Sequence, residues 1–492
     1  MSYEVLAFYV VLGVFAIIAL FSAIRIKNLD QFFNHPNPNQ RILPTILGNF
    51  SLATGVFFVF DGVGRFSYLF LLVPISTVVS YWLLWRLSQK LLSERKGNRH
   101  VLYENVGKAG IWGPPVFLGG LLLMQLIAYP GLIAAEIFFT STPISLFVFG
   151  EVEWGSYAIA ALILVVACIY TAIGGIQAVA RSEWAQAVGV LMLMGLLSYI
   201  VIDAASLQSL QTQDVERNSI TSPIKPDLNV ALIVALVAVV LAPIFTRFYS
   251  VVDLNIAGES RINETSSTDF RLIGFGLGFL YLWLSIIVLY YLFSTGNSAS
   301  LISLLQNYTS EPGFWANIVG IVFILGATSA VISTVDSFIL AISKGLTYAR
   351  GTLSGEPNGV SSKHVLLGSA VVVGISAIVG GYLYVLFAVN ASVIPILLTS
   401  TIGMAVMAPF AVEAALARHA RRQAIVDYLV AAVVVAFAAA FAWIWVAYSV
   451  IAGNENKAFQ IALAFQTSAV AVCVLPWVWR KMLWVWRKML ER

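Results

Sequence analysis

The chain has 492 residues, of which 60% are hydrophobic and only 11% are charged. A soluble domain carries about 25% charged residues, so this composition excludes a water-soluble globule. The net charge of +4 does not indicate a nucleic-acid-binding protein, because the basic residues lie between apolar runs and not in one patch. The two cysteines, Cys168 and Cys473, lie far apart inside apolar runs, which predicts neither a disulfide nor a metal site.

Thirteen apolar runs are long enough to cross a bilayer as helices, since a crossing takes about 20 apolar residues. The first begins at Tyr3 and has no small-residue cleavage site, so we expect a retained membrane span and no signal peptide. The sequence thus predicts an all-α polytopic membrane protein that forms a single domain over residues 1–492. In chain order the predicted spans are 3–25, 45–62, 66–91, 113–140, 155–174, 183–205, 228–250, 271–294, 315–346, 364–389, 391–416, 424–451 and 457–479.

Lysine and arginine are unevenly distributed over the connections between these spans. If the N-terminus lies outside, 24 of the 28 basic residues fall on the inside. Cytoplasmic loops carry an excess of Lys and Arg, so we predict that the N-terminus is outside and the C-terminus inside. The tail 480–492 belongs to a repeat in which Trp477–Leu483 is followed by the same seven residues at Trp484–Leu490. Tryptophan beside Arg-Lys suits the headgroup region, which favours a basic interfacial tail over a regulatory element.

Two spans contain features that interrupt a helix. Span 45–62 carries the stretch Gly48-Asn-Phe-Ser51-Leu-Ala-Thr54-Gly55, and span 228–250 contains Pro243. Carbonyl groups freed at such breaks bind cations in inverted-repeat transporters, although Gly and Pro also make simple packing kinks in membrane helices. The two spans lie five apart, which predicts one five-helix repeat over 45–205 and a second over 228–416. The extra helix 3–25 would precede this core, and two extra helices over 424–479 would follow it.

A polar strip lies inside the apolar span 315–346. Ser333, Asp336 and Ser337 share one helix face, Thr334 borders it, and Ala330 lies one turn earlier. Hydroxyl, carbonyl and carboxylate oxygens are the ligands that a hard cation such as sodium requires. Alternatively, serine and threonine bond only to the preceding turn of their own helix. Asp336 favours a functional role, because an ionisable group within a membrane helix is costly.

Two segments resemble motifs of the sodium/solute symporter family, which includes proline, pantothenate, sialic acid and sugar symporters. Ile332-Ser-Thr-Val-Asp-Ser337 is similar to the family's Met-Ser-Thr-x-Asp-Ser. The segment from Tyr170 to Gln186, with Gly174-Gly175 inside it, resembles Tyr-Thr-x-x-Gly-Gly-x-x-Ala-Val-x-x-Thr-Asp-x-x-Gln. Close similarity is confined to these segments. A departure at Thr246-Arg247-Phe248, where the family has Gln-Arg, weakens assignment to a known subfamily.

The resemblance implies a five-plus-five inverted-repeat core with sodium between its first and eighth helices, here spans 45–62 and 315–346. It implies that the hydroxyl groups of Ser333 and Thr334 are sodium ligands. It also implies backbone carbonyl ligands, which come from Ala330, Ser51 and Thr54. A second ion site of some members matches Glu183, Asp336 and Ser337, together with Ser333. Glu183 stands where the family has Asp, and it could instead form an interfacial salt bridge with Arg181. As substrate-pocket candidates we name Asp61, Gln125, Tyr129 and Glu136.

Glu136 is the most unusual of these candidates. If it faces the cavity it would attract a cationic group of the solute; alternatively it lies hydrated near the outer interface. Tyr81 and Trp82 are expected to be packing residues.

The predicted function is sodium-coupled symport of a small polar organic solute by alternating access. We expect no enzymatic activity and no cofactor other than Na⁺ as the coupling ion. The expected partners are the solute, Na⁺ and membrane lipid, for a monomer or loose oligomer in the bacterial inner membrane. Asp336 leaves proton coupling open. A transporter-like sensor is a further alternative, disfavoured because no soluble domain follows the spans. A channel would need a continuous polar lining, which the sequence does not show.

Overall fold

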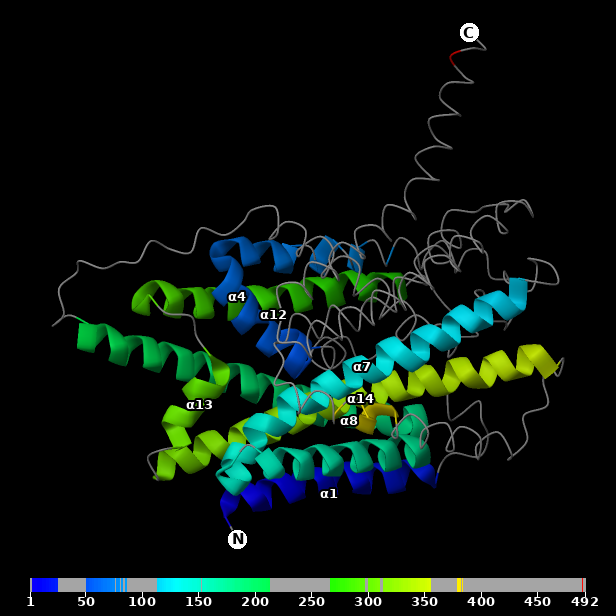
Figure 1. The fold of residues 1–492 in the computed structure, drawn as a ribbon, viewed down its shortest axis with the longest axis horizontal. Coiled ribbons are helices and arrows are strands. Elements are labelled where there is room, and N and C mark those ends of the chain that lie inside the picture. The colour runs from blue at the N-terminus through cyan, green and yellow to red at the C-terminus, as the bar shows by residue number, and fades with distance from the viewer. Residues whose placement is uncertain are drawn as a thin grey trace.

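All elements of the described part of the chain are helices (Figure 1). Within this part, six helical segments, two of them inside one bent helix, are long and apolar enough to cross a membrane, which confirms the predicted all-α membrane fold. They lie within 3–22, 130–149, 154–175, 181–207, 271–295 and 314–340. The computed structural model describes residues 2–24, 50–75, 77–79, 81, 82, 85, 113–151, 153–212, 266–296, 300–309, 313–354, 378–381, 383 and 489. Only the backbone is described at 23, 54, 65, 113–129, 153, 176, 180, 208–212, 266–270, 309 and 341–354.

These six helical segments match predicted spans one, four, five, six, eight and nine. Predicted spans 228–250, 391–416, 424–451 and 457–479 lie outside the described residues, as do most of 364–389 and the tail. The number of thirteen, the orientation and the division into two repeats therefore stay predictions.

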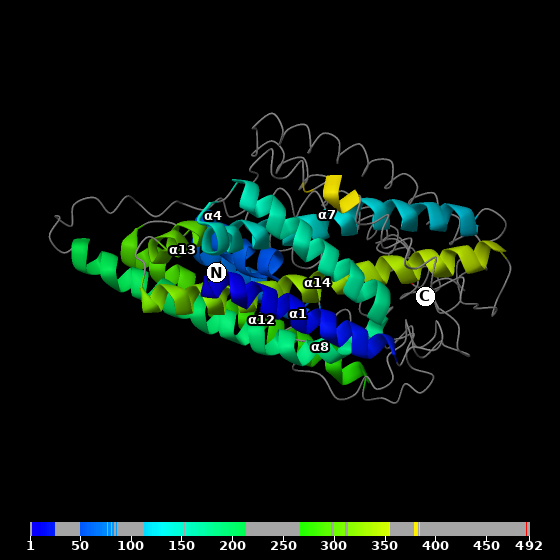
Figure 2. The same ribbon diagram turned by 90° about the horizontal axis from the view of Figure 1, so that it is seen from below.

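The first helix, α1 (Tyr3–Ala23), packs along the core. Phe8 and Phe15 are each only 1% exposed, and the ring of Phe15 meets Tyr170 edge-on at 5.8 Å. Figures 1 and 2 show α1 lying along α8 (Glu153–Thr212) and beside α14 (Phe314–Ser354). The retained membrane span predicted for this segment is therefore an integral part of the described bundle.

Helix α8 contains two predicted spans, 155–174 and 183–205, joined at a sharp bend. Gly175 at the bend has φ 49° and ψ −152°, a backbone conformation that residues with a Cβ atom rarely adopt. At Gly174 an added Cβ would lie 3.3 Å from the Ala19 backbone and 2.3 Å from the Ala178 Cβ. Both glycines therefore permit the bend, and Gly174 also permits the close approach of α1.

The second arm of α8 crosses α14 at small residues. A Cβ atom on Gly326 would lie 2.7 Å from the Gly189 carbonyl oxygen and 2.6 Å from the Leu193 Cβ. On the other side, a Cβ on Gly189 would meet the hydroxyl of Ser329 at 2.5 Å. Small residues let membrane helices approach closely, and here they bring the polar strip of α14 against α8.

Helix α12 (Ser266–Thr295) packs against α4 (Phe58–Phe66) and the 3₁₀ turn η3 (Ser67–Leu71). Gly274 of α12 lies against Tyr81, as expected for a packing residue, and the guanidinium of Arg271 lies 4.3 Å from the centre of the Trp85 ring. Trp82 is exposed.

A short helix, α13 (Leu301–Thr309), follows α12, and the Tyr308 hydroxyl donates a hydrogen bond to Asp203 of α8. Burial and this bond raise the pKa of Tyr308 above its ordinary value, so Tyr308 stays protonated at neutral pH.

The close crossing of α8 and α14 at Gly326 predicts that one added methyl group lowers stability at Gly326 but not at a glycine with open space around it. Gly326→Ala should destabilise the protein by about 1–3 kcal/mol, because the added Cβ overpacks the contact with α8. The matched variant Gly195→Ala, on α8, has no atom within 4 Å of the new Cβ and should be neutral or stabilising. Thermal unfolding midpoints in detergent measure both, and equal midpoints for the two variants would contradict the crossing.

Candidate functional site

The interrupted span 45–62 contains a π-helical turn. This turn, η2 (Leu52–Phe57), leads directly into α4, and the Val56 amide donates to the Ser51 carbonyl oxygen five residues back at 3.4 Å. π-Helical turns inside membrane helices are uncommon and often mark functional sites. The predicted irregularity in this span is therefore present over 51–57, whereas 45–49 lies outside the described residues.

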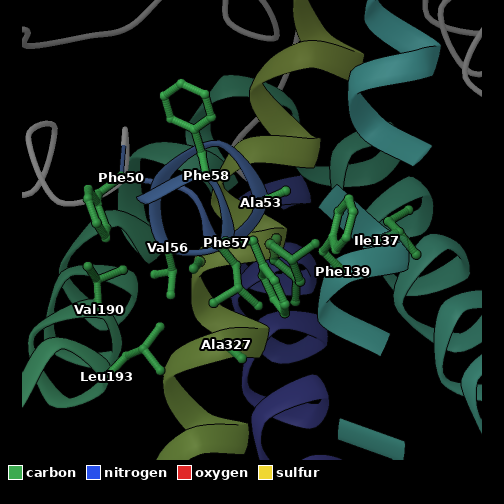
Figure 3. Packing of buried hydrophobic residues seen from close by; sticks show 14 of the residues in the cluster. Phe50, Ala53, Val56, Phe57, Phe58, Ile137, Phe139, Val190, Leu193 and Ala327 are labelled. Carbon is green, nitrogen blue, oxygen red and sulfur yellow. The ribbon is translucent and has the colours of Figure 1, made fainter. Parts of the chain in front are cut away.

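The turn η2 is fully enclosed by protein. Ser51, Leu52 and Ala53 each have an exposed fraction of 0%. Figure 3 shows the turn beside α14, which carries Ala327, with Ile137 and Phe139 on the neighbouring α7 (Gly113–Phe149); both helices contact η2. An unusual backbone conformation is thus held against two long helices and is shielded from lipid.

Glu136 of α7 bonds to the backbone of this turn. Its Oε2 atom accepts a hydrogen bond from the Ala53 amide at 3.0 Å, and its side chain is 0% exposed. The alternative of a hydrated Glu136 near the outer interface is therefore wrong. Packing of α7 on η2 excludes water from this carboxylate, which the sequence alone does not reveal.

The other substrate-pocket candidates are less well defined. Asp61, on α4, is half-buried. Gln125 and Tyr129 lie on α7 where only the backbone is described, so their side chains are outside the described part. Asp61 belongs to the interrupted span itself, and Glu136 is joined to that span from α7 by its bond to the Ala53 amide.

The hydroxyl-bearing strip of α14 faces the protein interior. Ala330, Ser333 and Thr334 are exposed by only 1%, 5% and 8%. The Thr334 hydroxyl donates to the Ala330 carbonyl at 3.2 Å, and the Ser337 hydroxyl donates to the Ser333 carbonyl at 2.9 Å. These are the bonds to the preceding turn that the sequence left as an alternative. They do not exclude cation binding, because a donating hydroxyl keeps its oxygen lone pairs.

The strip and the turn η2 belong to elements in contact, α14 and η2. The predicted sodium site would lie between these two elements. Ser51, directly before η2, is fully buried, and the Thr54 backbone forms part of η2, while the Thr54 side chain lies outside the described part. The individual ligands, Ser51, Thr54, Ala330, Ser333 and Thr334, stay a prediction.

A second polar cluster lies between α8 and α14, where the other predicted ion site falls. The fully buried Asp336 accepts hydrogen bonds from the Gln186 amide nitrogen at 3.4 Å and from the Ser337 hydroxyl at 3.2 Å. Glu183, partly exposed, is close enough to interact electrostatically with Asp336. Arg181, which the sequence offered as a partner for Glu183, donates to the Phe21 carbonyl and the Ser22 hydroxyl of α1, each at 3.2 Å.

Sequence reasoning did not single out Gln186 and Tyr170 at the second cluster. Gln186 bonds to Asp336, and the Tyr170 hydroxyl bonds to Ser182 beside them. Tyr170 and Gln186 are the two ends of the Tyr-to-Gln motif, so the motif itself carried the signal. Thr328 on α14 was not predicted; its hydroxyl is buried without a hydrogen-bond partner in the described part of the chain. The described residues contain no group of three or more His, Cys, Asp or Glu side chains that could hold a metal ion.

The helices and their arrangement define the class of protein: an α-helical integral membrane protein. No family model and no curated protein sequence matches the chain. The fold is similar to that of a Na⁺-coupled sialic acid symporter in its substrate-bound outward-open state, with 14% identity, 95% of this chain and 97% of that chain covered, and a TM-score of 0.60.

Two further solved structures show weaker likeness. One is MhsT in complex with L-phenylalanine, at 15% identity over 81% of this chain and 97% of that chain, with a TM-score of 0.48. The other is a manganese transporter of Eremococcus coleocola, at 12% identity over 89% and 93%, with a TM-score of 0.46.

The Asp336 cluster generates a stability prediction. Gln186→Leu removes one hydrogen-bond donor to a buried carboxylate and should lower stability by about 1–3 kcal/mol. The same substitution at the exposed Gln306 on α13 should lower stability less, because a solvent-exposed amide leaves no buried carboxylate without a donor. Thermal unfolding in detergent compares the two variants. A Gln186→Leu protein as stable as wild type would show that this amide does not support Asp336.

Proposed function

We propose that the chain is a secondary active transporter that couples sodium entry to uptake of a small polar organic solute by alternating access. The observation that carries the proposal is the contact of the π-helical turn η2 with α14, the helix that bears the buried hydroxyl strip. The fold shared with a Na⁺-coupled symporter supports the same conclusion. Transport of this kind needs no covalent chemistry, so we expect no enzymatic activity.

In this proposal sodium binds between η2 and α14. The carbonyl oxygens of Ser51, Thr54 and Ala330 and the hydroxyl oxygens of Ser333 and Thr334 replace its water shell. A buried sodium ion needs several oxygen ligands, and neutral carbonyls and hydroxyls provide them without a strong charge of their own. An ion held by both elements stabilises the conformation in which they are in contact. Sodium therefore shifts the conformational equilibrium of the carrier, which is how a coupling ion acts.

Asp336, Glu183 and Ser337 form a proposed second ion site. The hydrogen bonds that Asp336 receives from Gln186 and Ser337 come from neutral groups. A fully buried carboxylate with such partners requires either a cation or a proton. This observation keeps proton coupling as the second candidate function, with Asp336 as the proton carrier.

The remaining parts of the proposal follow from the same mechanism. The partners are the solute, Na⁺ and the surrounding lipid, and the protein acts as a monomer or a loose oligomer. A bacterial inner membrane is the proposed location, since a sodium or proton gradient across it would supply the driving force.

Sodium should stabilise the purified protein and should potentiate solute binding. In a thermal-shift screen of small metabolites, ligands of the native state raise the unfolding midpoint by mass action. We expect at least one metabolite to do so in sodium chloride and to lose most of its effect in potassium chloride. Uptake of that metabolite into proteoliposomes should require an inward sodium gradient. Uptake that is driven by a pH gradient and does not depend on sodium would show that the coupling ion is a proton and not sodium.

The hydroxyl ligands can be tested against a matched pair. Ser333→Ala/Thr334→Ala should raise the sodium concentration for half-maximal uptake by about tenfold or more, the equivalent of roughly 1.4 kcal/mol. The control is Ser141→Ala/Thr142→Ala on α7, an adjacent, buried Ser-Thr pair that also bonds to its own helix. This control should keep the wild-type sodium dependence. Unchanged sodium dependence in the first variant would refute the proposed ligands.

A further inference from the structure

The contact between Glu136 and Ala53 lies where a helix begins inside the membrane protein. The first backbone hydrogen bond of η2 joins the Val56 amide to the Ser51 carbonyl, so the amide groups from Leu52 to Gly55 precede it. The amides of a first helical turn have no acceptor within their helix. Glu136, 83 residues away in sequence, supplies an acceptor to one of them, the Ala53 amide. Its carboxylate therefore caps this helix start from a neighbouring helix.

A helix start of this kind is an anion-binding position. Its amides point outward and the helix dipole adds partial positive charge, so carboxylates bind there. Broken helices of transporters use such starts to hold an anionic group of the solute. In this chain the position is occupied by a side chain of the protein itself, and that side chain is 0% exposed.

We infer that Glu136 fills the anion-binding position of the interrupted span, so that the transported solute presents hydrogen-bond donors, such as an ammonium or hydroxyl group, and no carboxylate there. The inference rests on the proposed function, because it requires the solute to bind beside η2. A second carboxylate at the same helix start would meet the charge of Glu136 in a poorly hydrated site. Like charges in such surroundings repel strongly, whereas donor groups are attracted.

The first test asks whether the helix start binds a carboxylate once Glu136 is removed. Glu136→Ala should unfold at a lower temperature than wild type, and sodium acetate should recover part of the loss relative to sodium chloride at equal ionic strength. Glu136→Ser replaces it if the alanine variant cannot be purified. Wild type and Glu136→Gln should gain nothing specific from acetate, because a side-chain oxygen still occupies the position.

Asp203→Ala provides the control for this test, since that carboxylate accepts from the Tyr308 hydroxyl and caps no helix start. It should show no acetate-specific gain. Absence of acetate rescue in both Glu136→Ala and Glu136→Ser would overturn the inference. An acetate effect of equal size in wild type would also overturn it.

The second test uses pairs of probes that differ only in a hydroxymethyl group or a carboxylate: choline with glycine betaine, and ethanolamine with glycine. The carboxylate member should not stabilise wild type more than its partner in sodium chloride. Sodium-dependent stabilisation by glycine or glycine betaine alone would overturn the inference but leave sodium coupling intact. Acetate rescue of Glu136→Ala, combined with solute binding that does not depend on sodium, would distinguish the two proposals in the other direction. It would support the capping role of Glu136 and refute sodium symport.

Discussion

A backbone amide that begins a helix in the middle of a membrane protein must find an acceptor, and here the Ala53 amide finds the Glu136 carboxylate. Leaving such a group unsatisfied in a low-dielectric interior costs several kcal/mol. The bond joins η2 to α7, and η2 also contacts α14, the helix that bears the hydroxyl strip. The irregular turn, the proposed ion site and the proposed solute position therefore all depend on one contact between distant parts of the sequence.

Much of this architecture could be predicted from sequence because the bilayer imposes strong constraints on length and polarity. The spans at 3–25, 155–174, 183–205, 271–294 and 315–346 follow from unbroken apolar runs. The break near Ser51 follows from small and polar residues within such a run. Gly174 and Gly175 stood out as a motif, but their roles depend on the approach of α1 and on a positive φ angle, which only coordinates supply.

The sites were less predictable, because they depend on which helix faces meet. The buried face of α14 follows from the i, i+3, i+4 spacing of Ser333, Asp336 and Ser337. The burial of Glu136 does not follow from local sequence, since its neighbours on α7 would equally suit a hydrated helix end. Gln186 was visible as a motif position, yet its role emerges only when α8 bends and brings that amide to Asp336. The individual sodium ligands remain a prediction.

The bend at Gly175 gives the N-terminal helix an unexpected importance. Three contacts on α8, namely the Phe15–Tyr170 ring pair, the close approach at Gly174 and the Arg181 bonds to the end of α1, lie on both sides of the bend. Helix α1 thus contacts both arms of α8 and stabilises the angle between them. Deleting or replacing this helix would change the geometry of the buried acid at Asp336, so α1 is an unsuitable place for truncation or fusion in engineered versions of the protein.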